Sequence, residues 1–184
     1  SRLTKFMTST KVQPYADYPM SKIAGEEMDK ATDLFAKMIN AKNNEIIIGG
    51  STSINLYVLS NALRSSLEPG DEIILSPWTM SACAMSILHW NAIPVFADID
   101  PKTFCIDPNS IEANISPYTK AIMAIDIFGQ SANMKAITKI AKKYDLKVIS
   151  DTAQAPGAKY FGEYAGTLAD IGGYSLNYHK HINS

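Results

Sequence analysis

The sequence predicts an α/β fold in which a mainly parallel sheet is covered by helices on both faces. Short, nearly continuous apolar runs alternate along the chain with segments whose apolar residues recur every three or four positions. Strands that are buried on both faces of a parallel sheet have this near-continuous apolar composition. The chain has 184 residues, 46% of them hydrophobic and 19% charged, which is enough for a substantial core. Because it contains no internal repeat or linker, we expect one domain beyond an N-terminal arm.

The N-terminal part is expected to form this arm and then a helix. Residues 1–25 include Pro14 and Pro19 and show little periodicity, so they are predicted to be irregular. From there to about Asn40, apolar residues recur at helical spacing and predict an amphipathic helix. Residues 45–48 are predicted to form a short buried strand, followed by a helix that opens at Ser51.

The remaining elements follow the same alternation. We predict strands over residues 72–75, 93–97, 120–125 and 147–150, and helices over residues 80–90, 108–114 and 134–144. Gly157 and Gly162 bracket short extended pieces that are expected to form a hairpin.

The composition excludes several classes of function. The net charge is −1 and there is no basic run, so neither nucleic acid nor an anionic membrane surface is an expected partner. No apolar run approaches the roughly 20 residues of a membrane span, and the first residues lack the apolar segment of a signal peptide, so we expect a cytoplasmic protein. Cys83 and Cys105 lie in apolar segments without metal-binding spacing, which predicts two buried thiols and no metal site. His89 is expected to end a helix.

Two residues near the end of the chain suggest a pyridoxal phosphate site. Asp151 follows the strand-like run 147–149 directly, and Lys180 lies among aromatic and small polar residues. A pyridoxal enzyme needs a lysine amine to hold the aldehyde as a Schiff base, and a carboxylate to keep the pyridine nitrogen protonated so that the ring can act as an electron sink. The alternatives are a solvated surface lysine and an aspartate that caps a turn or helix.

Two further features suit a phosphorylated, flat ligand. Gly49 and Gly50 follow the strand predicted over residues 45–48, and the next helix begins with Ser51 and Thr52. Free backbone amides and hydroxyls at such a helix start can bind phosphate, although an ordinary Ser/Thr cap has the same sequence. Trp78 lies just after the strand at 72–75, where it could stack on a ring or simply pack. All these groups fall at the carboxyl ends of strands, where ligands bind in open α/β sheets.

The order of the motifs resembles that of the DegT-like sugar aminotransferases, which belong to fold type I of the pyridoxal enzymes. The similarity runs from about residue 26 to the end, and its motifs are Gly50-Ser51-Thr52, Pro77-Trp78-Thr79, Pro94 to Pro101, Phe128-Gly129-Gln130, Asp151 to Ala158, Tyr174-Ser175 and Lys180.

The resemblance implies a role for each matching residue. Lys180 would form the Schiff base and move the substrate's proton, and Asp151 would pair with the pyridinium nitrogen. Gln154 would bond the phenolic oxygen of the ring and Trp78 would stack on it. Ser51, Thr52 and Ser175 would hold the phosphate.

The resemblance also implies the activity and the extent of the protein. The expected enzyme transfers an amino group from glutamate or glutamine to a keto sugar, one linked to a nucleotide, as a homodimer with shared sites. A related branch that dehydrates sugars has histidine in place of the lysine, so Lys180 favours transamination. Residues 26–184 would be the N-terminal half of the cofactor-binding large domain, without the small domain. His179 and His181 could contact substrate or only support Lys180.

Two other hypotheses are kept. A cysteine desulfurase or related fold type I lyase shares the Asp-x-Ala-Gln motif, but such enzymes usually stack a histidine on the ring, whereas this chain has Trp78. A non-catalytic regulatory member of the fold would not need a complete site, and Lys180, Asp151 and Gln154 argue against it.

Overall fold

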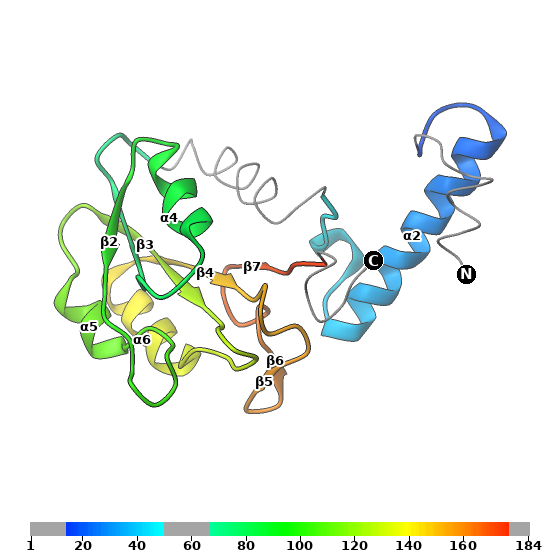
Figure 1. The fold of residues 1–184 in the computed structure, drawn as a ribbon. Helices are drawn as coiled ribbons and strands as arrows, with labels where there is room; N and C mark the ends of the chain where they lie inside the picture. The colour runs from blue at the N-terminus through cyan, green and yellow to red at the C-terminus, as the bar shows by residue number, and fades with distance from the viewer. Residues whose placement is uncertain (1–13, 50–66, 177–184) are drawn as a thin grey trace. The chain divides into compact units, whose positions relative to one another are not determined.

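The computed structural model describes residues 14–49 and 67–176 (Figure 1). The chain forms two compact units, Ser1–Ile48 and Gly49–Ser184. Each unit is described by itself.

The first unit consists mainly of helix α2, Pro19–Ile39, followed by the 3-10 turn η2, Asn43–Glu45. The helix begins six residues before the predicted start, because Pro19 occupies its first turn, where a missing N–H costs nothing. It ends at Asn40, whose left-handed backbone (φ 58°) caps the helix. The prediction of a buried strand over residues 45–48 was wrong. Ile47 is 83% exposed, and no segment in the described part of the chain pairs with it.

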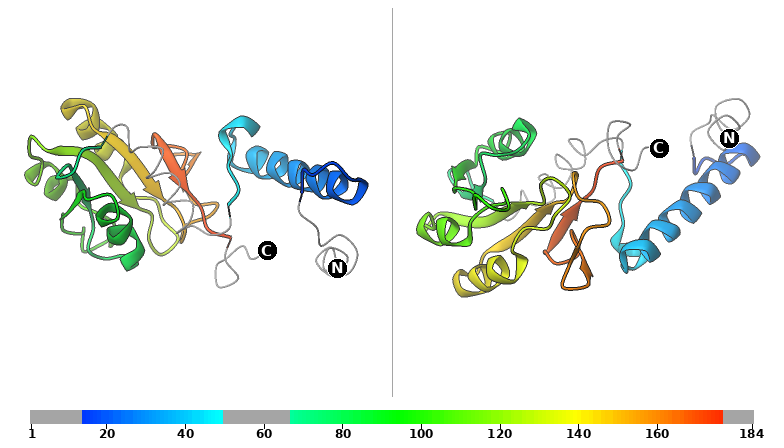
Figure 2. Two further views of the ribbon diagram at one scale, coloured as in Figure 1. Left: turned by 90° about the horizontal axis from the view of Figure 1, so that it is seen from above. Right: turned by 60° about the horizontal axis from the view of Figure 1, so that its bottom comes forward.

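The second unit contains a five-stranded sheet in the order β2-β1-β3-β4-β7, and every neighbouring pair is parallel. Helix α4 lies on one face of the sheet, and helices α5 and α6 lie together on the other (Figures 1 and 2). This arrangement confirms the predicted fold class. The hairpin expected between the two glycines is present as β5 and β6. The strands are β1 Glu72–Leu75, β2 Ile93–Phe96, β3 Thr119–Ile125, β4 Lys147–Asp151, β5 Lys159–Tyr160, β6 Glu163–Tyr164 and β7 Ile171–Gly173, and the helices are α4 Ser81–Leu88, α5 Pro108–Ala113 and α6 Met134–Tyr144.

The core of this unit lies between the sheet and its helices. Ile74 and Ile122 from the central strands are fully buried, as are Ile111 of α5 and Ile137 of α6.

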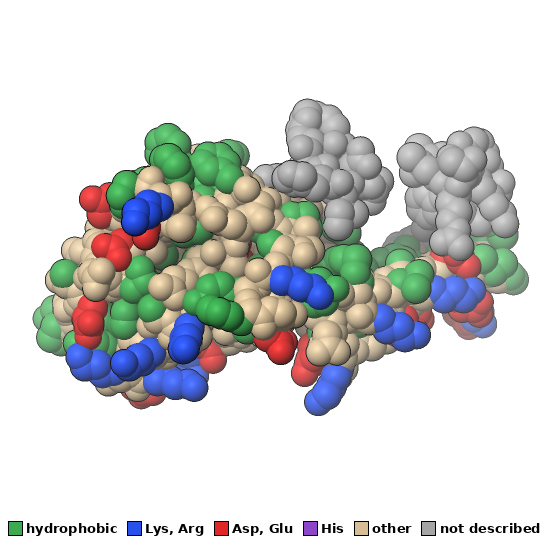
Figure 3. All heavy atoms as spheres, turned by 90° about the horizontal axis from the view of Figure 1, so that it is seen from below, with side chains coloured by type: hydrophobic (Ala, Val, Ile, Leu, Met, Phe, Trp, Pro, Cys, Tyr) green, Lys and Arg blue, Asp and Glu red, His purple; other side chains and the backbone are tan. Residues whose placement is uncertain are grey.

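The outer face of α6 is charged and ends in Lys142 and Lys143, next to the negative end of the helix dipole. Figure 3 shows lysine side chains gathered on one part of the surface with acidic groups among them. The alternation of apolar and charged positions along α6 therefore fixes which face meets the sheet.

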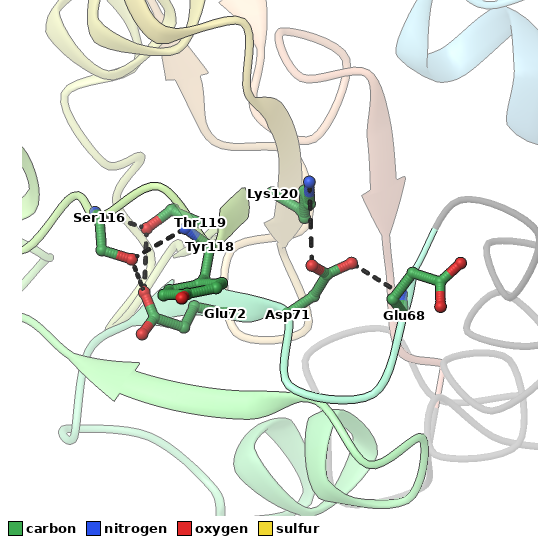
Figure 4. A network of polar contacts seen from close by, with 7 residues as sticks. All are labelled: Glu68, Asp71, Glu72, Ser116, Tyr118, Thr119 and Lys120. Atoms are coloured by element: carbon green, nitrogen blue, oxygen red, sulfur yellow. Dashed lines mark hydrogen bonds and ion pairs between the residues drawn. The ribbon is translucent and has the colours of Figure 1, made fainter.

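A polar network secures the amino ends of β1 and β3 (Figure 4). The Glu72 carboxylate accepts hydrogen bonds from the hydroxyls of Ser116 and Thr119. Asp71 accepts a bond from the Glu68 N–H at 2.7 Å and lies 3.8 Å from the ammonium of Lys120. The pairing of β1 with β3 shifts register here, between the first two residues of β1. These contacts lie at the amino ends of the strands, whereas the candidate site lies at the opposite edge, where the strands have their carboxyl ends.

Candidate functional site

The carboxyl edge of the sheet brings together the ends of β4 and β7. Asp151 is the last residue of β4 and pairs in register with Gly173, the last residue of β7. Ser175 follows two residues later, and both Asp151 and Ser175 are buried. Asp151 and Ser175 thus lie at neighbouring strand ends, of which only the one before Asp151 was predicted from the sequence.

The Asp151 carboxylate is held at both oxygens. Its Oδ1 accepts a hydrogen bond from the Ala153 N–H at 3.0 Å, and its Oδ2 lies 3.2 Å from the Cys83 sulfur. The residue is only 8% exposed. A buried carboxylate needs hydrogen-bond donors to remain charged. Asp151 has two, the Ala153 N–H and the Cys83 thiol, and its oxygens keep lone pairs that can accept from a further, cationic donor.

Cys83 connects this carboxylate to another loop. It lies in the first turn of α4 and is 1% exposed, which confirms the prediction that it is buried. Its sulfur is also 3.3 Å from the Thr79 hydroxyl. Burial, followed by the negative charge of Asp151, raises the pKa of the Cys83 thiol to about 12. The contact with Asp151 was not predicted. The sequence could have indicated only that Cys83 lies near the site, because the first turn of a helix that follows a strand lies at the carboxyl edge of the sheet.

Trp78 lies in the loop after β1 and is 49% exposed. Its backbone N–H donates to the buried Ser76 hydroxyl at 3.0 Å, which shapes the turn. The indole lies 6.2 Å from the ring of Phe104, and Phe104 lies 6.0 Å from the ring of Phe128 in an edge-to-face arrangement. These distances are typical of favourable aromatic pairs. The loops after β1, β2 and β3 thus each contribute an exposed ring, and only the ring of Trp78 was predicted from the sequence to take part in a site.

Gln154 lies in the turn that follows β4. Its side-chain oxygen accepts a long hydrogen bond, 3.5 Å, from the backbone N–H of Phe128. Phe128 itself has a left-handed backbone with φ 54°, a conformation that is uncommon for aromatic residues and tends to occur near functional sites. The contact ties the loop after β3 to the turn that carries Gln154.

A second buried carboxylate, Asp126, supports the end of β4. It is fully buried, and it accepts hydrogen bonds from Ser150 Oγ at 2.9 Å, Thr152 Oγ1 at 2.8 Å and the Ala132 N–H at 2.8 Å. Its own N–H donates to the Asp151 carbonyl at 2.9 Å. Burial raises the pKa of Asp126, although the hydrogen bonds act against this. No role was predicted for Asp126 from the sequence, although it follows the apolar run 120–125 just as Asp151 follows the run 147–150.

The structure therefore brings Asp151, Gln154, Ser175 and the Trp78 loop to one edge of the sheet. Lys180, Ser51 and Thr52, as well as His179 and His181, lie outside the described residues. Among the residues that the structure does describe, no cluster of acidic, cysteine or histidine side chains could hold a metal ion. In the same part of the chain, no helix has the length and apolar character needed to cross a membrane.

The described residues fit a cationic aromatic ring. Asp151 is a buried carboxylate with free acceptor capacity, and an opposite charge beside it favours the protonated form of a pyridine nitrogen. Gln154 and Trp78 come from the turns that follow β4 and β1 at the same edge. An amide and an exposed indole are suitable partners for a polar substituent and a ring face.

Two curated proteins illustrate what the chain is similar to. A putative L-glutamine:3-amino-2,3-dideoxy-scyllo-inosose aminotransferase of Streptoalloteichus tenebrarius is 39% identical over 82% of this chain and 35% of that protein. A pleiotropic regulatory protein of Geobacillus stearothermophilus is 41% identical over 84% of this chain and 40% of that protein. The chain thus spans well under half the length of these relatives.

Solved structures show the same fold. An aminotransferase from Psychrobacter cryohalolentis superimposes with a TM-score of 0.81 at 34% identity, covering 88% of this chain and 40% of that one. A Bacillus subtilis protein with bound cofactor PMP superimposes with a TM-score of 0.68 at 30% identity, covering 89% of this chain and 35% of that one. The DegT/DnrJ/EryC1/StrS aminotransferase family matches residues 16–184. The chain belongs to this family.

Proposed function

We propose that this protein is a pyridoxal phosphate-dependent aminotransferase that moves an amino group from glutamate or glutamine to a keto sugar linked to a nucleotide. The observation that carries the proposal is Asp151, a buried carboxylate at the end of β4 with acceptor capacity left over. Family membership and the bound PMP of the Bacillus subtilis structure support the choice of cofactor.

Each described residue has a task in this proposal. Asp151 keeps the pyridine nitrogen protonated, because its negative charge stabilises the cation beside it. Gln154 donates its amide to the phenolic oxygen, Trp78 covers one ring face, and Ser175 donates its hydroxyl to the phosphate. When bound, pyridoxal phosphate supplies an aldehyde that condenses with amines and a ring that accepts electrons.

Three tasks fall to residues outside the described part of the chain. Lys180 would bind the aldehyde and carry the proton to and from the substrate's α-carbon. Ser51 and Thr52 would bind the phosphate at the start of the helix expected there. These assignments rest on the resemblance of the sequence motifs.

The substrate class rests on the relatives. The name of the Streptoalloteichus protein pairs L-glutamine with 3-amino-2,3-dideoxy-scyllo-inosose, and a similar protein of Aneurinibacillus thermoaerophilus is named a dTDP-3-amino-3,6-dideoxy-alpha-D-galactopyranose transaminase. We infer the same chemistry for this chain, acting as a homodimer whose sites are shared between subunits. Residues 26–184 would belong to the cofactor-binding large domain, preceded by the arm at residues 1–25.

The alternatives have less support. Family membership favours transamination over the cysteine desulfurase hypothesis. The regulatory hypothesis has one observation in its favour, the name of the Geobacillus relative.

The test is an absorbance spectrum of the longest available form of the protein with pyridoxal phosphate, before and after adding glutamate or glutamine. We expect a visible-edge band that disappears with the amino donor and is absent in Lys180→Ala. Lys139→Ala, which removes an exposed lysine from α6, is the matched control and should retain the band. A band that responds to cysteine alone would support the lyase. A wild-type protein that binds no cofactor would refute the proposal.

A further inference from the structure

We propose that Cys83 is a positioning residue of the cofactor site, whose thiol holds the Asp151 carboxylate in the orientation that faces the pyridine nitrogen. This inference rests on the function proposed above. It concerns a residue that the sequence assigned only to packing.

The geometry fixes the direction of the hydrogen bond. The Cys83 sulfur and Asp151 Oδ2 are 3.2 Å apart in a buried setting, a distance at which the thiol and the carboxylate form a hydrogen bond. Since burial and the nearby carboxylate raise the pKa of the thiol to about 12, the proton stays on sulfur near neutral pH. Cys83 is therefore the donor and Asp151 the acceptor. The Ala153 N–H holds the other oxygen, so both ends of the carboxylate are fixed.

The same thiol links two parts of the site. Because the S–H is engaged with Asp151, the Thr79 hydroxyl at 3.3 Å is the donor to the sulfur. A short relay then runs from Thr79 through Cys83 to Asp151, and Thr79 is the neighbour of Trp78 in the loop after β1. The relay passes over β3, which separates β1 from β4 in the sheet. The relay therefore connects the Trp78 loop, which would cover one face of the pyridine ring, to the Asp151 carboxylate, which would keep the ring nitrogen protonated.

The weak donor has a chemical advantage over a hydroxyl. An S–H group is a poor hydrogen-bond donor, so it orients the carboxylate while leaving most of the negative charge available. A serine hydroxyl would form a shorter and stronger bond to an ionised acceptor. It would compete more strongly with the pyridinium for the same charge.

The first experiment observes the bond without any cofactor. In Cys105→Ser the only remaining thiol is Cys83, and its infrared S–H stretching band should lie at a lower frequency than that of a thiol without a hydrogen bond. Introducing Asp151→Ala in this background should move the band to higher frequency. A band that does not respond to Asp151→Ala would overturn the inference.

The second experiment measures cofactor binding in Cys83→Ala and Cys83→Ser, with Cys105→Ala as the matched control for loss of a buried thiol. We expect Kd for pyridoxal phosphate to rise about five- to tenfold in Cys83→Ala and less than about threefold in Cys83→Ser, which keeps a donor. The pH titration of the cofactor band should shift in both Cys83 variants but not in the control.

The outcomes separate the two proposals. If the wild type binds cofactor and Cys83→Ala has the same Kd and the same titration, the positioning role is refuted and the proposed function stands. If the wild type binds no cofactor, the proposed function fails and this role with it, although the infrared band still reports the bond between Cys83 and Asp151.

Discussion

Asp126 should be among the most sensitive positions for stability in the sheet unit. Its carboxylate is fully buried and accepts hydrogen bonds from the Ala132 N–H and from the hydroxyls of Ser150 and Thr152, which precede and follow Asp151 in the chain. Replacing Asp126 with alanine removes all three. Replacing it with asparagine keeps the shape and leaves an oxygen for the Ala132 N–H.

The expected cost differs between the two variants. In Asp126→Ala the Ala132 N–H loses its partner inside the protein, which costs roughly 1–3 kcal/mol. The Ser150 and Thr152 hydroxyls lie 3.1 Å apart and can bond to each other, so their combined loss is about 1–2 kcal/mol. The sum is a decrease of about 2–5 kcal/mol in the free energy of unfolding. Asp126→Asn should lose less than about 1.5 kcal/mol, because a hydroxyl can accept from the new amide.

The pH dependence gives an independent check. Burial raises the pKa of Asp126 above 3.8, the ordinary value of an aspartate, so between that value and the raised pKa the native state binds more protons than the unfolded state. The free energy of unfolding contributed by this group is therefore highest below pH 3.8 and is lost as the pH rises through the folded pKa. Asp126→Asn cannot titrate and should lack this component.

Urea denaturation of the wild type and both variants, followed by far-UV circular dichroism at several pH values, measures these quantities. The reasoning would be refuted if Asp126→Ala lost less than about 1 kcal/mol or if asparagine were as damaging as alanine. An unchanged pH profile in Asp126→Asn would show that burial does not shift this carboxyl.

Three shorter predictions follow from the same structure. Gly172→Ala should lower the free energy of unfolding by about 3 kcal/mol or more, because its Cβ would lie 1.9 Å from the Gly166 carbonyl oxygen. The control is Gly173→Ala in the same strand, where the nearest atom to the new Cβ is the Ser150 carbonyl oxygen at 3.8 Å, and equal melting temperatures of the two variants would contradict the expectation. Glu72→Ala should lose about 1–2 kcal/mol through the two hydroxyls it accepts at the start of β1, and a melting temperature equal to that of the wild type would show that this network is dispensable. Cys83 should not react with Ellman's reagent at pH 8 until urea unfolds the protein, because it is 1% exposed and has a pKa of about 12; prompt labelling of a Cys105→Ser variant would contradict this.

The sequence was sufficient for most of the sheet unit because its signals are local. The prediction of a helix over residues 134–144 matches α6, where apolar positions at helical spacing meet the sheet. The prediction of a buried strand over residues 45–48 was wrong, although this apolar run has the composition of a buried strand. A strand also needs a neighbour to pair with, and in the described part of the chain this run has none. Composition predicts the tendency to form a strand, whereas pairing depends on residues elsewhere.

The candidate site shows the same division between local and distant information. Asp151 could be predicted because a carboxylate directly after an apolar run lies at a strand's carboxyl end whichever strands are its neighbours. The role of Cys83 could not, because its partner is 68 residues away and the contact exists only if α4 lies over the end of β4. That placement follows from the strand order β1-β3-β4, which no local pattern specifies. The apolar segment around Cys83 was therefore enough to predict that the thiol is buried. It was not enough to predict that the buried thiol has the Asp151 carboxylate as its hydrogen-bond acceptor, which is the basis of the role proposed for it.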